Sequence, residues 1–380
     1  MTRTLLVTND FPPTLGGIQS YLRDYVDTLD PADTVVFAST QDRAAAAEHD
    51  AGVRYRVYRW DRRIMLPTPA TAREMERIIR AENIETVWFG AAAPLALMAP
   101  AARRAGARRI VASTHGHEVG WSMIPGARSA LRRIGEHCDH ITYISEYTLG
   151  RFRRAFGGNV TFSPLPSGVD TTLFNPASAQ EHLETRRRFS VPATAPLIVC
   201  ISRLVPRKGQ DQLIRAMPMV LSRHPDAHLL MVGEGSYRRK LTSMIGDDIA
   251  GNVRLVGKLG FAEMRQLLAA ADVFAMPCRT RGRGLDVEGL GIVYLEAQAS
   301  GVPVIAGDSG GAPETVTPDT GIVVGGRDTD ALSNSLIRLL DDAELRERMG
   351  QAGRRHVLGN WTWDTMAARL RNVLSGTASI

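Results

Sequence analysis

Short apolar runs rich in β-branched residues alternate with longer segments of helical periodicity, and this alternation constrains the fold more than any other feature. Seven such runs lie in the first half, at 3–9, 34–40, 54–60, 86–90, 109–114, 140–145 and 160–166. Six more follow, at 197–204, 228–235, 253–259, 272–278, 302–308 and 321–326. Strands that alternate with helices indicate βα units and parallel sheets. We therefore expect a doubly wound α/β protein.

The amino-acid composition changes between residues 167 and about 196, where Ser, Thr, Pro and Asn become frequent. A chain of 380 residues is also long for a single domain. We predict one Rossmann-like domain at 1–170 and a second at 171–360. The remaining segment, 361–380, has the periodicity of a helix.

Composition limits where the protein works. The hydrophobic fraction is 44%, yet no run approaches the roughly twenty apolar residues of a membrane span. The apolar run near the N-terminus is too short for a signal peptide. The three cysteines, Cys138, Cys200 and Cys278, have neither metal nor disulfide spacing. These features predict a cytoplasmic protein with reduced thiols.

The charge balance points to an anionic partner. The net charge is +6 and the pI is about 9.5, so a nucleic acid, a nucleotide and an anionic lipid surface are all open. Binding of single-stranded nucleic acid needs basic residues interleaved with stacking aromatics, a pattern that occurs only at 54–63. We therefore expect no nucleic-acid partner.

Lysine is rare in this chain and its position is informative. Of 46 basic residues only Lys208, Lys240 and Lys258 are lysines. Lys208 lies between a predicted strand and a predicted helix, where ligands gather in open α/β sheets. A compact ammonium reaches a phosphate as a point charge, which a planar guanidinium does less well. Arg203 and Lys208 can together neutralise a diphosphate, although solvated loop charges would look the same.

The segment "EGLGIVYLEA" at 288–297 is the second candidate site. Glu288 and Glu296 are eight residues apart, with Gly289 and Gly291 at the predicted start of a helix between them. The N–H groups of such a helix start favour an anion. One carboxylate can hold sugar hydroxyls and the other a ribose. Taken singly, the two glutamates would also fit a helix cap and a surface acid.

Several motifs together resemble the retaining glycosyltransferases of family four, which have the GT-B fold. They are "TNDFPPTLGGIQSYL", "VASTHGHE", "SGVDTTLFNP", "SRLVPRKG", "VGEG", "LVGKLG" and "EGLGIVYLEA", and they span nearly the whole chain. The resemblance implies two Rossmann-like domains with an interdomain cleft, the acceptor in the first domain and the nucleotide sugar in the second. It also implies that the last helix packs back on the first domain.

The resemblance assigns roles to matching residues. Arg203 and Lys208 would bind the diphosphate, Glu288 the donor sugar and Glu296 the ribose. His115 would lie near the transferred sugar, with His117 as the second choice. The other implied contacts are backbone contacts to the diphosphate at Gly16, Gly17, Gly289, Gly291, Ile292 and Val293, and contacts to the base at Gly257, Lys258 and Leu259.

One departure from the family pattern concerns the donor and acceptor. The segment before Glu288, "PCRTRGRGLDVEGLG", is longer and more basic than usual. It resembles the GDP-mannose-dependent phosphatidylinositol monomannoside mannosyltransferases, which implies GDP-mannose as donor and a phosphatidylinositol mannoside as acceptor. Another nucleotide sugar, such as a UDP-sugar, with a different acceptor stays open. Arg279, Arg281 and Arg283 also fit solvated charges on a mobile loop.

Rival functions lack their motifs. A dinucleotide-dependent dehydrogenase needs G-x-G-x-x-G after a strand, but Gly233 and Gly235 are followed by Arg238 in place of the third glycine. The acidic triplet 328–330 is better explained as a helix cap than as a metal site. We therefore expect neither a metal ion nor a cofactor. A nucleotide-binding module without catalysis stays possible, but His115 and the Gly-Gly loop argue against it.

The chain has no obvious nucleophile for a double displacement. We therefore expect the leaving diphosphate to accept the acceptor's proton on the face from which it departs, with retention of configuration. Arg203, Lys208 and the helix start would stabilise its charge, and Glu288 and His115 would act on the sugar.

A lipid acceptor requires docking on a membrane. Arginines cluster in the first 170 residues, and Arg128, Arg132 and Arg133 follow Trp121 and Met123. Such clusters suit an anionic headgroup surface, although each one alone also fits an ordinary solvated helix face. We predict peripheral binding at the inner face of the cell membrane.

Overall fold

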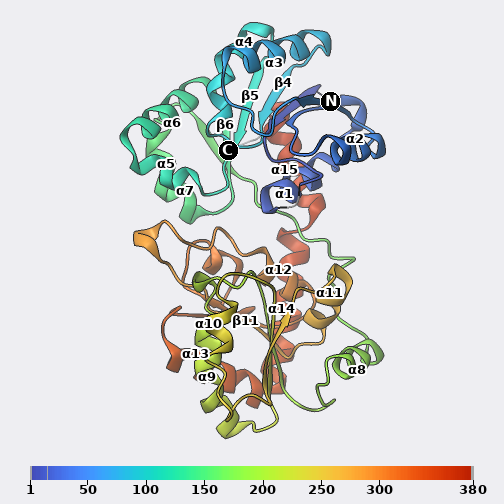
Figure 1. Ribbon diagram of the computed structural model, residues 1–380, viewed down its shortest axis with the longest axis vertical. Coiled ribbons are helices and arrows are strands. Elements are labelled where there is room, and N and C mark those ends of the chain that lie inside the picture. The colour runs from blue at the N-terminus through green and yellow to red at the C-terminus, as the bar shows by residue number, and fades with distance from the viewer. Residues whose placement is uncertain (1, 15, 378–380) are drawn as a thin grey trace. The chain divides into compact units, whose positions relative to one another are not determined.

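The computed structural model describes residues 2–14 and 16–377 and divides the chain into two compact units. The first unit consists of residues 1–167 and 363–380, and the second of residues 168–362. Each has its own sheet and its own hydrophobic core (Figure 1). The first unit is therefore discontinuous in sequence.

Seven parallel strands form the sheet of the first unit, in the order β3-β2-β1-β4-β5-β6-β7. They are β1 (Thr4–Thr8), β2 (Thr34–Ser39), β3 (Arg56–Trp60), β4 (Thr86–Phe89), β5 (Arg109–Ser113), β6 (His140–Tyr143) and β7 (Thr161–Pro164). Every residue of β1, β2, β4 and β6 is buried, as expected for strands covered on both faces. The strand order reverses between β1 and β4, which is where ligands bind in such sheets.

The helices of the first unit pack on both faces of this sheet. They are α1 (Gly17–Val26), α2 (Arg43–Gly52), α3 (Pro69–Ala81), α4 (Ala99–Ala105), α5 (Glu118–Met123), α6 (Pro125–His137), α7 (Glu146–Phe152) and α15 (Trp363–Ser375). Helix α4 contacts both α3 and α6, whereas α15 lies against β4 and β5. Tyr25 of α1 meets Trp363 of α15 edge to face, with ring centroids 5.1 Å apart.

Six parallel strands form the sheet of the second unit, in the order β10-β9-β8-β11-β12-β13. They are β8 (Leu197–Ile201), β9 (His228–Val232), β10 (Val253–Gly257), β11 (Val273–Met276), β12 (Val304–Gly307) and β13 (Gly321–Val324). Their β-branched and apolar side chains form most of the centre of the core. The order reverses between β8 and β11, so the loops after these two strands form the second switch point.

Seven helices enclose this second sheet among the described residues. They are α8 (Ala179–Arg188), α9 (Gln210–Arg223), α10 (Arg238–Thr242), α11 (Phe261–Ala269), α12 (Ile292–Ala299), α13 (Thr329–Asp341) and α14 (Ala343–Asn360). Figure 1 shows α9, α10 and α13 on one side of the sheet and α11, α12 and α14 on the other. The pairs α9–α13 and α12–α14 pack closely together. This is the doubly wound arrangement that the alternation of runs predicts.

The last helix confirms the predicted return of the chain to the first domain. Two carbonyls at the C-terminal end of α15 accept hydrogen bonds from the first sheet. Thr86 Oγ1 donates to Leu374 O at 3.2 Å, and Arg109 Nε donates to Val373 O at 2.6 Å. These bonds satisfy carbonyls that have no partner within the helix.

The predicted strands and the predicted cap are also confirmed. Each of the thirteen predicted runs contains one of the strands β1 to β13. Asp328 precedes α13, and its side chain accepts a hydrogen bond from the N–H of Ala331 at 2.9 Å. The triplet 328–330 therefore begins a helix, as expected.

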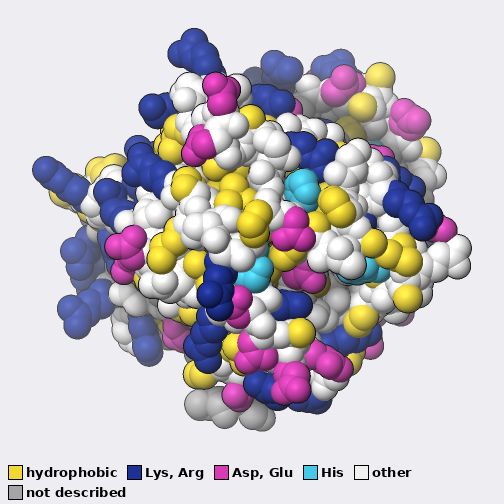
Figure 2. Space-filling model, turned by 90° about the horizontal axis from the view of Figure 1, so that it is seen from below, with side chains coloured by type: hydrophobic (Ala, Val, Ile, Leu, Met, Phe, Trp, Pro, Cys, Tyr) yellow, Lys and Arg dark blue, Asp and Glu magenta, His cyan; other side chains and the backbone are white. Residues whose placement is uncertain are grey.

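Basic side chains do not form one continuous surface on the face of the molecule in Figure 2, where Lys and Arg lie among Asp and Glu. The basic-aromatic run at 54–63 shows how such charges are neutralised. Arg59 pairs with Asp50 at 2.6 Å, and both Arg56 and Tyr58 bind the buried Glu82. These side chains hold the first sheet together.

Candidate functional site

Two loops at the switch point of the second unit carry most of the predicted donor residues. The β8–α9 loop comprises residues 202–209, and the β11–α12 loop comprises residues 277–291. Strands β8 and β11 are adjacent and parallel, so both loops leave the same edge of the sheet. The sheet order therefore brings Lys208 and Glu288 together, although they are eighty residues apart in sequence.

Lys208 and Glu288 form an ion pair in which Nζ lies 2.6 Å from Oε2. Both side chains are about nine-tenths buried. The backbone of Glu288 is fixed by the loop that follows β12. Its N–H donates to Ser309 Oγ at 3.3 Å, and its carbonyl accepts from Gly311 N at 3.0 Å. The structure thus holds an ammonium and a carboxylate in contact where a ligand is expected.

Arg203, at the start of the β8–α9 loop, is exposed. Among the described residues its guanidinium has neither an ion pair nor a hydrogen bond, and only its backbone carbonyl is engaged, by Gln210 Nε2 and by the N–H of Val205, both at 2.9 Å. The carboxyl-terminal edge of this sheet therefore carries two cations. Lys208 is already paired with a carboxylate, and Arg203 is not. Together they provide the positive charge that a diphosphate requires.

Helix α12 starts beside this pair. Gly291 precedes it with a φ of 88°, a conformation that favours glycine, and Ile292 and Val293 are its first two residues. The N–H groups of these positions have no partner within the helix. Their orientation and the helix dipole favour an anion at the same edge.

Glu296 lies one turn into α12. No hydrogen bond or ion pair to its carboxylate occurs among the described residues, and burial raises its pKa to about 7. A carboxyl group without partners in such a place is suited to hydroxyl groups of a ligand, which donate to the carboxylate. This chemistry agrees with the predicted ribose contact, which stays a prediction.

The residues predicted to meet the base lie at the end of β10. Gly257 is buried and its carbonyl accepts from Gly233 N at 2.8 Å, whereas Lys258 is exposed and Leu259 half-buried. Strand β10 is separated from β8 only by β9. All predicted donor residues of the second unit therefore belong to one edge of one sheet.

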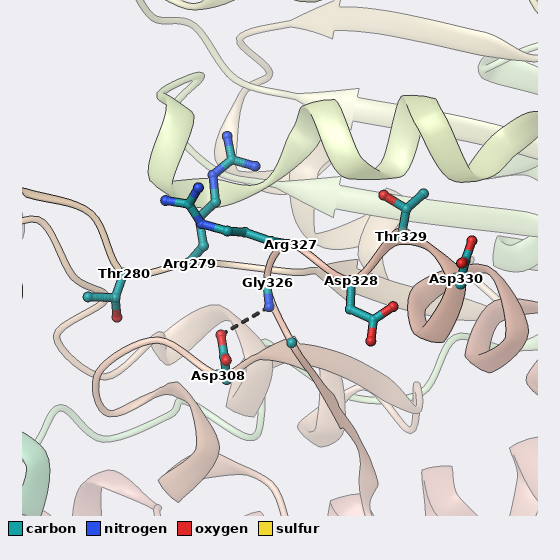
Figure 3. Close-up of a pocket in the computed structure, with 9 residues that line it drawn as sticks. Arg279, Thr280, Asp308, Gly326, Arg327, Asp328, Thr329 and Asp330 are labelled. Carbon is teal, nitrogen blue, oxygen red and sulfur yellow. Dashed lines mark hydrogen bonds between the residues drawn. The ribbon is translucent and has the colours of Figure 1, made fainter.

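A pocket of about 800 Å³ lies on the other side of this edge, at the ends of β11, β12 and β13 (Figure 3). Charged and hydroxyl side chains line it, and Asp308 accepts a hydrogen bond from Gly326 N at 3.0 Å. Of the arginines before Glu288, only Arg279 lines this pocket. No predicted site residue does, so the pocket is distinct from the predicted donor site.

Arg279 also corrects one interpretation of the sequence. It is nine-tenths buried and pairs with Asp211 at 2.9 Å, so it is not a solvated charge. Arg281 is exposed and lies 3.7 Å from Asp286. Arg283 is exposed and has no partner among the described residues. Only the last two fit the solvated loop that the sequence allows.

His115, in the first unit, follows β5 and reaches the switch point between β1 and β4. Its Nε2 lies 2.7 Å from the carbonyl of Gly90, directly after β4. A carbonyl can only accept, so Nε2 carries the proton and Nδ1 is left as an acceptor. Burial lowers the pKa of His115 to about 4, so the ring is neutral at pH 7. Tyr21 packs edge to face on it at 4.9 Å.

Three neighbours of His115 form a polar cluster that sequence reasoning missed in part. His117 is exposed, lies parallel to the His115 ring and contacts Glu118 at 3.1 Å. Glu118 is buried and accepts from the N–H groups of His115 and Gly116, both at 3.1 Å. Asp10 follows β1; burial raises its pKa, and His117 opposes that shift. The position of Asp10 directly after a buried strand was the available signal.

The Gly-Gly loop precedes α1 at the same switch point. Gly16 is the residue before α1, and Gly17 begins it. A methyl group added to Gly17 would meet no protein atom within 4 Å. The fold of the first unit therefore gives no reason for glycine at this position, whereas close approach of a ligand would.

Two family models match the chain, one to each half. Residues 15–173 match the model of glycosyltransferase family 4, and residues 182–356 match that of the glycosyl transferases group 1. Structural neighbours agree in fold across nearly the whole chain. Anabaena HepE in complex with UDP has a TM-score of 0.81 at 19% identity, covering 99% of this chain and all of the other. A sucrose-phosphate synthase from Thermosynechococcus elongatus has a TM-score of 0.77 at 21% identity, covering 99% of both chains.

Closer relatives come from actinobacteria. The chain is 59% identical over 372 residues to the GDP-mannose-dependent monoacylated alpha-(1-6)-phosphatidylinositol monomannoside mannosyltransferase of Corynebacterium glutamicum, covering 98% of this chain and 97% of that one. It is 53% identical over 376 residues to the GDP-mannose-dependent alpha-(1-6)-phosphatidylinositol monomannoside mannosyltransferase of Mycolicibacterium smegmatis, covering 98% of both. The predicted fold class and family are thereby confirmed, and the chain belongs to the GT-B glycosyltransferases of family four.

Proposed function

We propose that the protein transfers mannose from GDP-mannose to a phosphatidylinositol mannoside with retention of configuration. The observation that carries this proposal is the buried Lys208–Glu288 pair between β8 and β11, beside an unpartnered Arg203 and the start of α12. Cations for a diphosphate and a carboxylate for sugar hydroxyls lie together there. Both actinobacterial relatives are named for this donor and for a phosphatidylinositol monomannoside substrate.

In this proposal the second unit holds the donor. Arg203, Lys208 and the N–H groups of Ile292 and Val293 bind the diphosphate, and Glu296 binds the ribose hydroxyls. The donor's bond from the anomeric carbon to the phosphate oxygen breaks, and negative charge develops on the diphosphate. Preorganised cations and dipoles aimed at this charge lower the barrier to transfer. Because they balance the charge, the mechanism needs no metal ion or further cofactor.

The acceptor hydroxyl forms the new bond to the anomeric carbon on the face from which the diphosphate leaves. Its proton passes to a phosphate oxygen of the departing GDP, so the configuration is retained. The first unit holds the acceptor. His115 accepts a hydrogen bond from the transferred sugar through its unprotonated Nδ1, whereas the surrounding Asp10, His117 and Glu118 suit an acceptor rich in hydroxyl groups.

Turnover tests the donor and the acceptor separately. The protein is incubated with phosphatidylinositol monomannoside and either GDP-mannose or a panel of UDP-sugars. We expect transfer only from GDP-mannose, with an α-linked product by NMR of the anomeric proton. Transfer from a UDP-sugar alone would favour the alternative donor, and GDP binding without any transfer would favour a non-catalytic module.

Glu288→Ala tests the assignment of the sugar contact. Because Glu288 faces the sugar in this proposal, the substitution should lower kcat for transfer more than affinity for GDP. Calorimetric titration with GDP supplies the affinity. Equal losses in both quantities would contradict the role assigned to Glu288.

We also propose that the first unit binds an anionic membrane at the inner face of the cell membrane. Within the described residues no helix is both long and apolar enough to cross a bilayer. On and before α6, Arg128, Arg132 and Arg133 are exposed, as are Met123 and Ile124, at 54% and 60% of their surface. Such a mixture of cations and apolar side chains suits an interface with anionic lipid.

Sedimentation with vesicles tests this surface. We expect salt-reversible binding to vesicles containing phosphatidylinositol and weaker binding when Arg128, Arg132 and Arg133 are all changed to Ser. A variant in which Arg348 and Arg371 are both changed to Ser is the control for loss of positive charge elsewhere. Equal sedimentation with neutral vesicles, unaffected by salt, would exclude the proposed surface.

A further inference from the structure

The two loops of the donor edge are joined by three ion pairs, and only the central one involves the predicted site residues. Arg207 and Asp211 lie before and after Lys208 in sequence, and their pairs, Arg207–Asp286 at 3.2 Å and Arg279–Asp211 at 2.9 Å, are here called the flanking pairs of Lys208–Glu288. In each pair one residue comes from the β8–α9 segment and the other from the β11–α12 loop.

The backbones of the two segments are also in direct contact. The N–H of Arg279 donates to the carbonyl of Arg207 at 2.8 Å. A methyl group added to Gly209, whose φ is 79°, would lie 2.0 Å from the carbonyl oxygen of Pro277. The β11–α12 loop therefore cannot move away from the β8–α9 loop without breaking the flanking pairs and these contacts.

Asp286 connects the Arg207–Asp286 pair to the position of Glu288. Two backbone hydrogen bonds close a hairpin between Arg281 and Asp286, at 2.9 and 3.2 Å. Residues 282–284, at the turn, all have left-handed backbone conformations. Glu288 follows Asp286 by two residues, so the carboxylate of Asp286, held by Arg207, fixes the approach of the chain to Glu288.

Binding of the donor explains why the flanking pairs are needed. A diphosphate that engages Lys208 brings negative charge beside Glu288 and weakens the attraction that holds the central pair. The diphosphate and the carboxylate of Glu288, both negatively charged, then repel each other. The flanking pairs involve neither Lys208 nor Glu288, so they keep the loops together when the central pair is weakened.

We infer that Asp286 and Arg207, with the buried pair Arg279–Asp211, are positioning residues that hold Glu288 against the sugar once the diphosphate has engaged Lys208. This inference rests on the proposed function. It assigns a structural reason to two charged residues before Glu288, because Arg279 and Asp286 both pair with residues of the β8–α9 segment.

The Arg207–Asp286 pair gives the clearer experiment, because both side chains are partly exposed. The accessible fraction is 21% for the Arg207 side chain and 41% for the Asp286 side chain. Removing one partner of the buried pair would leave an unpaired charge and could unfold the unit. Asp286→Asn and Arg207→Gln should each lower kcat for mannose transfer about tenfold, since small displacements of a catalytic group are costly. Affinity for GDP should change less than about threefold, because neither side chain contacts the diphosphate in this arrangement.

The charge exchange Arg207→Asp with Asp286→Arg should recover most of kcat, which a loss of stability alone would not explain. Arg283→Gln is the matched control, because this arginine lies in the same hairpin without a partner among the described residues. A kcat within twofold of the parent in Asp286→Asn would overturn the inference. So would a loss of kcat matched by an equal loss of GDP affinity.

Hydrogen exchange separates this inference from the proposed function. In the protein without nucleotide, Asp286→Asn should speed exchange at the amides of Arg279 and Arg281, whereas Arg283→Gln should not. Unchanged exchange at both amides would refute the link between the two loops, whatever the donor is. Faster exchange in a protein that transfers no mannose would instead refute the proposed function and leave the link standing.

Discussion

The two units have the same doubly wound design, yet their switch points differ in chemistry. Between β8 and β11 the second unit places ion pairs across its loops, with Lys208 and Glu288 at the centre. Between β1 and β4 the first unit places a neutral imidazole, bound to a backbone carbonyl and packed against Tyr21. In the proposed function, the first of these edges meets the charge that develops on the leaving diphosphate, and the other meets hydroxyl groups that stay nearly neutral.

The largest effect that this comparison predicts is at Lys208. Lys208→Ala should lower kcat/KM by about a thousandfold, because a preorganised cation is lost from the leaving diphosphate and Glu288 is left buried without a partner. Lys208→Arg should recover little, since the guanidinium is too large for a site that is nine-tenths buried. Steady-state kinetics at several GDP-mannose concentrations measures both. Full activity in Lys208→Arg would break the argument for a compact charge.

His115 tests the neutral side of the comparison. His115→Ala should lower kcat about a hundredfold and leave affinity for GDP unchanged, because the imidazole serves the sugar and not the diphosphate. The pKa of about 4 adds a pH test. Since the unfolded chain binds this proton near pH 6.5, stability should fall as pH decreases from 6.5 toward 4.

His115→Gln keeps a polar side chain but cannot take up a proton in this range. The variant should lose part of the decline in stability, as measured by urea unfolding at each pH. His140, whose pKa burial also lowers to about 4, supplies a matched second histidine of the same unit. An identical decline in the parent and in His115→Gln would show that His115 is not the buried neutral group described.

The smallest predicted effect concerns Glu296 and sharpens the comparison within the second unit. Burial raises its pKa to about 7, so we expect part of the nucleotide-free protein to carry a protonated Glu296 at neutral pH. Ribose hydroxyls donate to the carboxylate and favour the charged form. Affinity for GDP should therefore rise severalfold from pH 6 to pH 7 and level off above it, with release of protons.

Calorimetry in two buffers of different ionisation enthalpy measures that proton release. The phosphate groups of GDP also titrate near this range, so Glu296→Gln is the necessary control. The variant should retain only the part of the pH dependence that GDP itself causes. If both proteins release the same number of protons, Glu296 does not contact the ribose as proposed.

The strands and the location of the sites follow from local features of the sequence. Each of the thirteen runs forms a strand, and most of these strands are buried because their side chains are apolar, whereas the edge strands β3 and β7 are partly exposed. Lys208 was predicted between a strand and a helix, and Glu288 beside the glycines at a helix start, from local sequence alone. The return of the last helix to the first unit came from the family resemblance and not from any pattern within 361–380.

The contacts across loops could not be predicted in this way. Arg279 and Asp211 are distant in sequence, and their pairing depends on β8 and β11 being neighbours. Alternating runs do not determine the order of strands in a sheet. The involvement of Asp10 likewise depends on α5 bringing Glu118 and His117 toward β1. Whether an arginine within a basic segment is buried depends on its acidic partner, and the sequence of that segment alone does not identify the partner.

The discontinuity of the first unit has a consequence for biosynthesis. Strands β4 and β5 are synthesised more than 260 residues before α15 is complete. This helix packs against them and accepts the hydrogen bonds of Thr86 and Arg109. The second unit is continuous and can fold as soon as residue 362 has emerged. The first unit is thus completed only after the second, and a nascent chain stopped before α15 exposes apolar surface of its first sheet to the cell's chaperones.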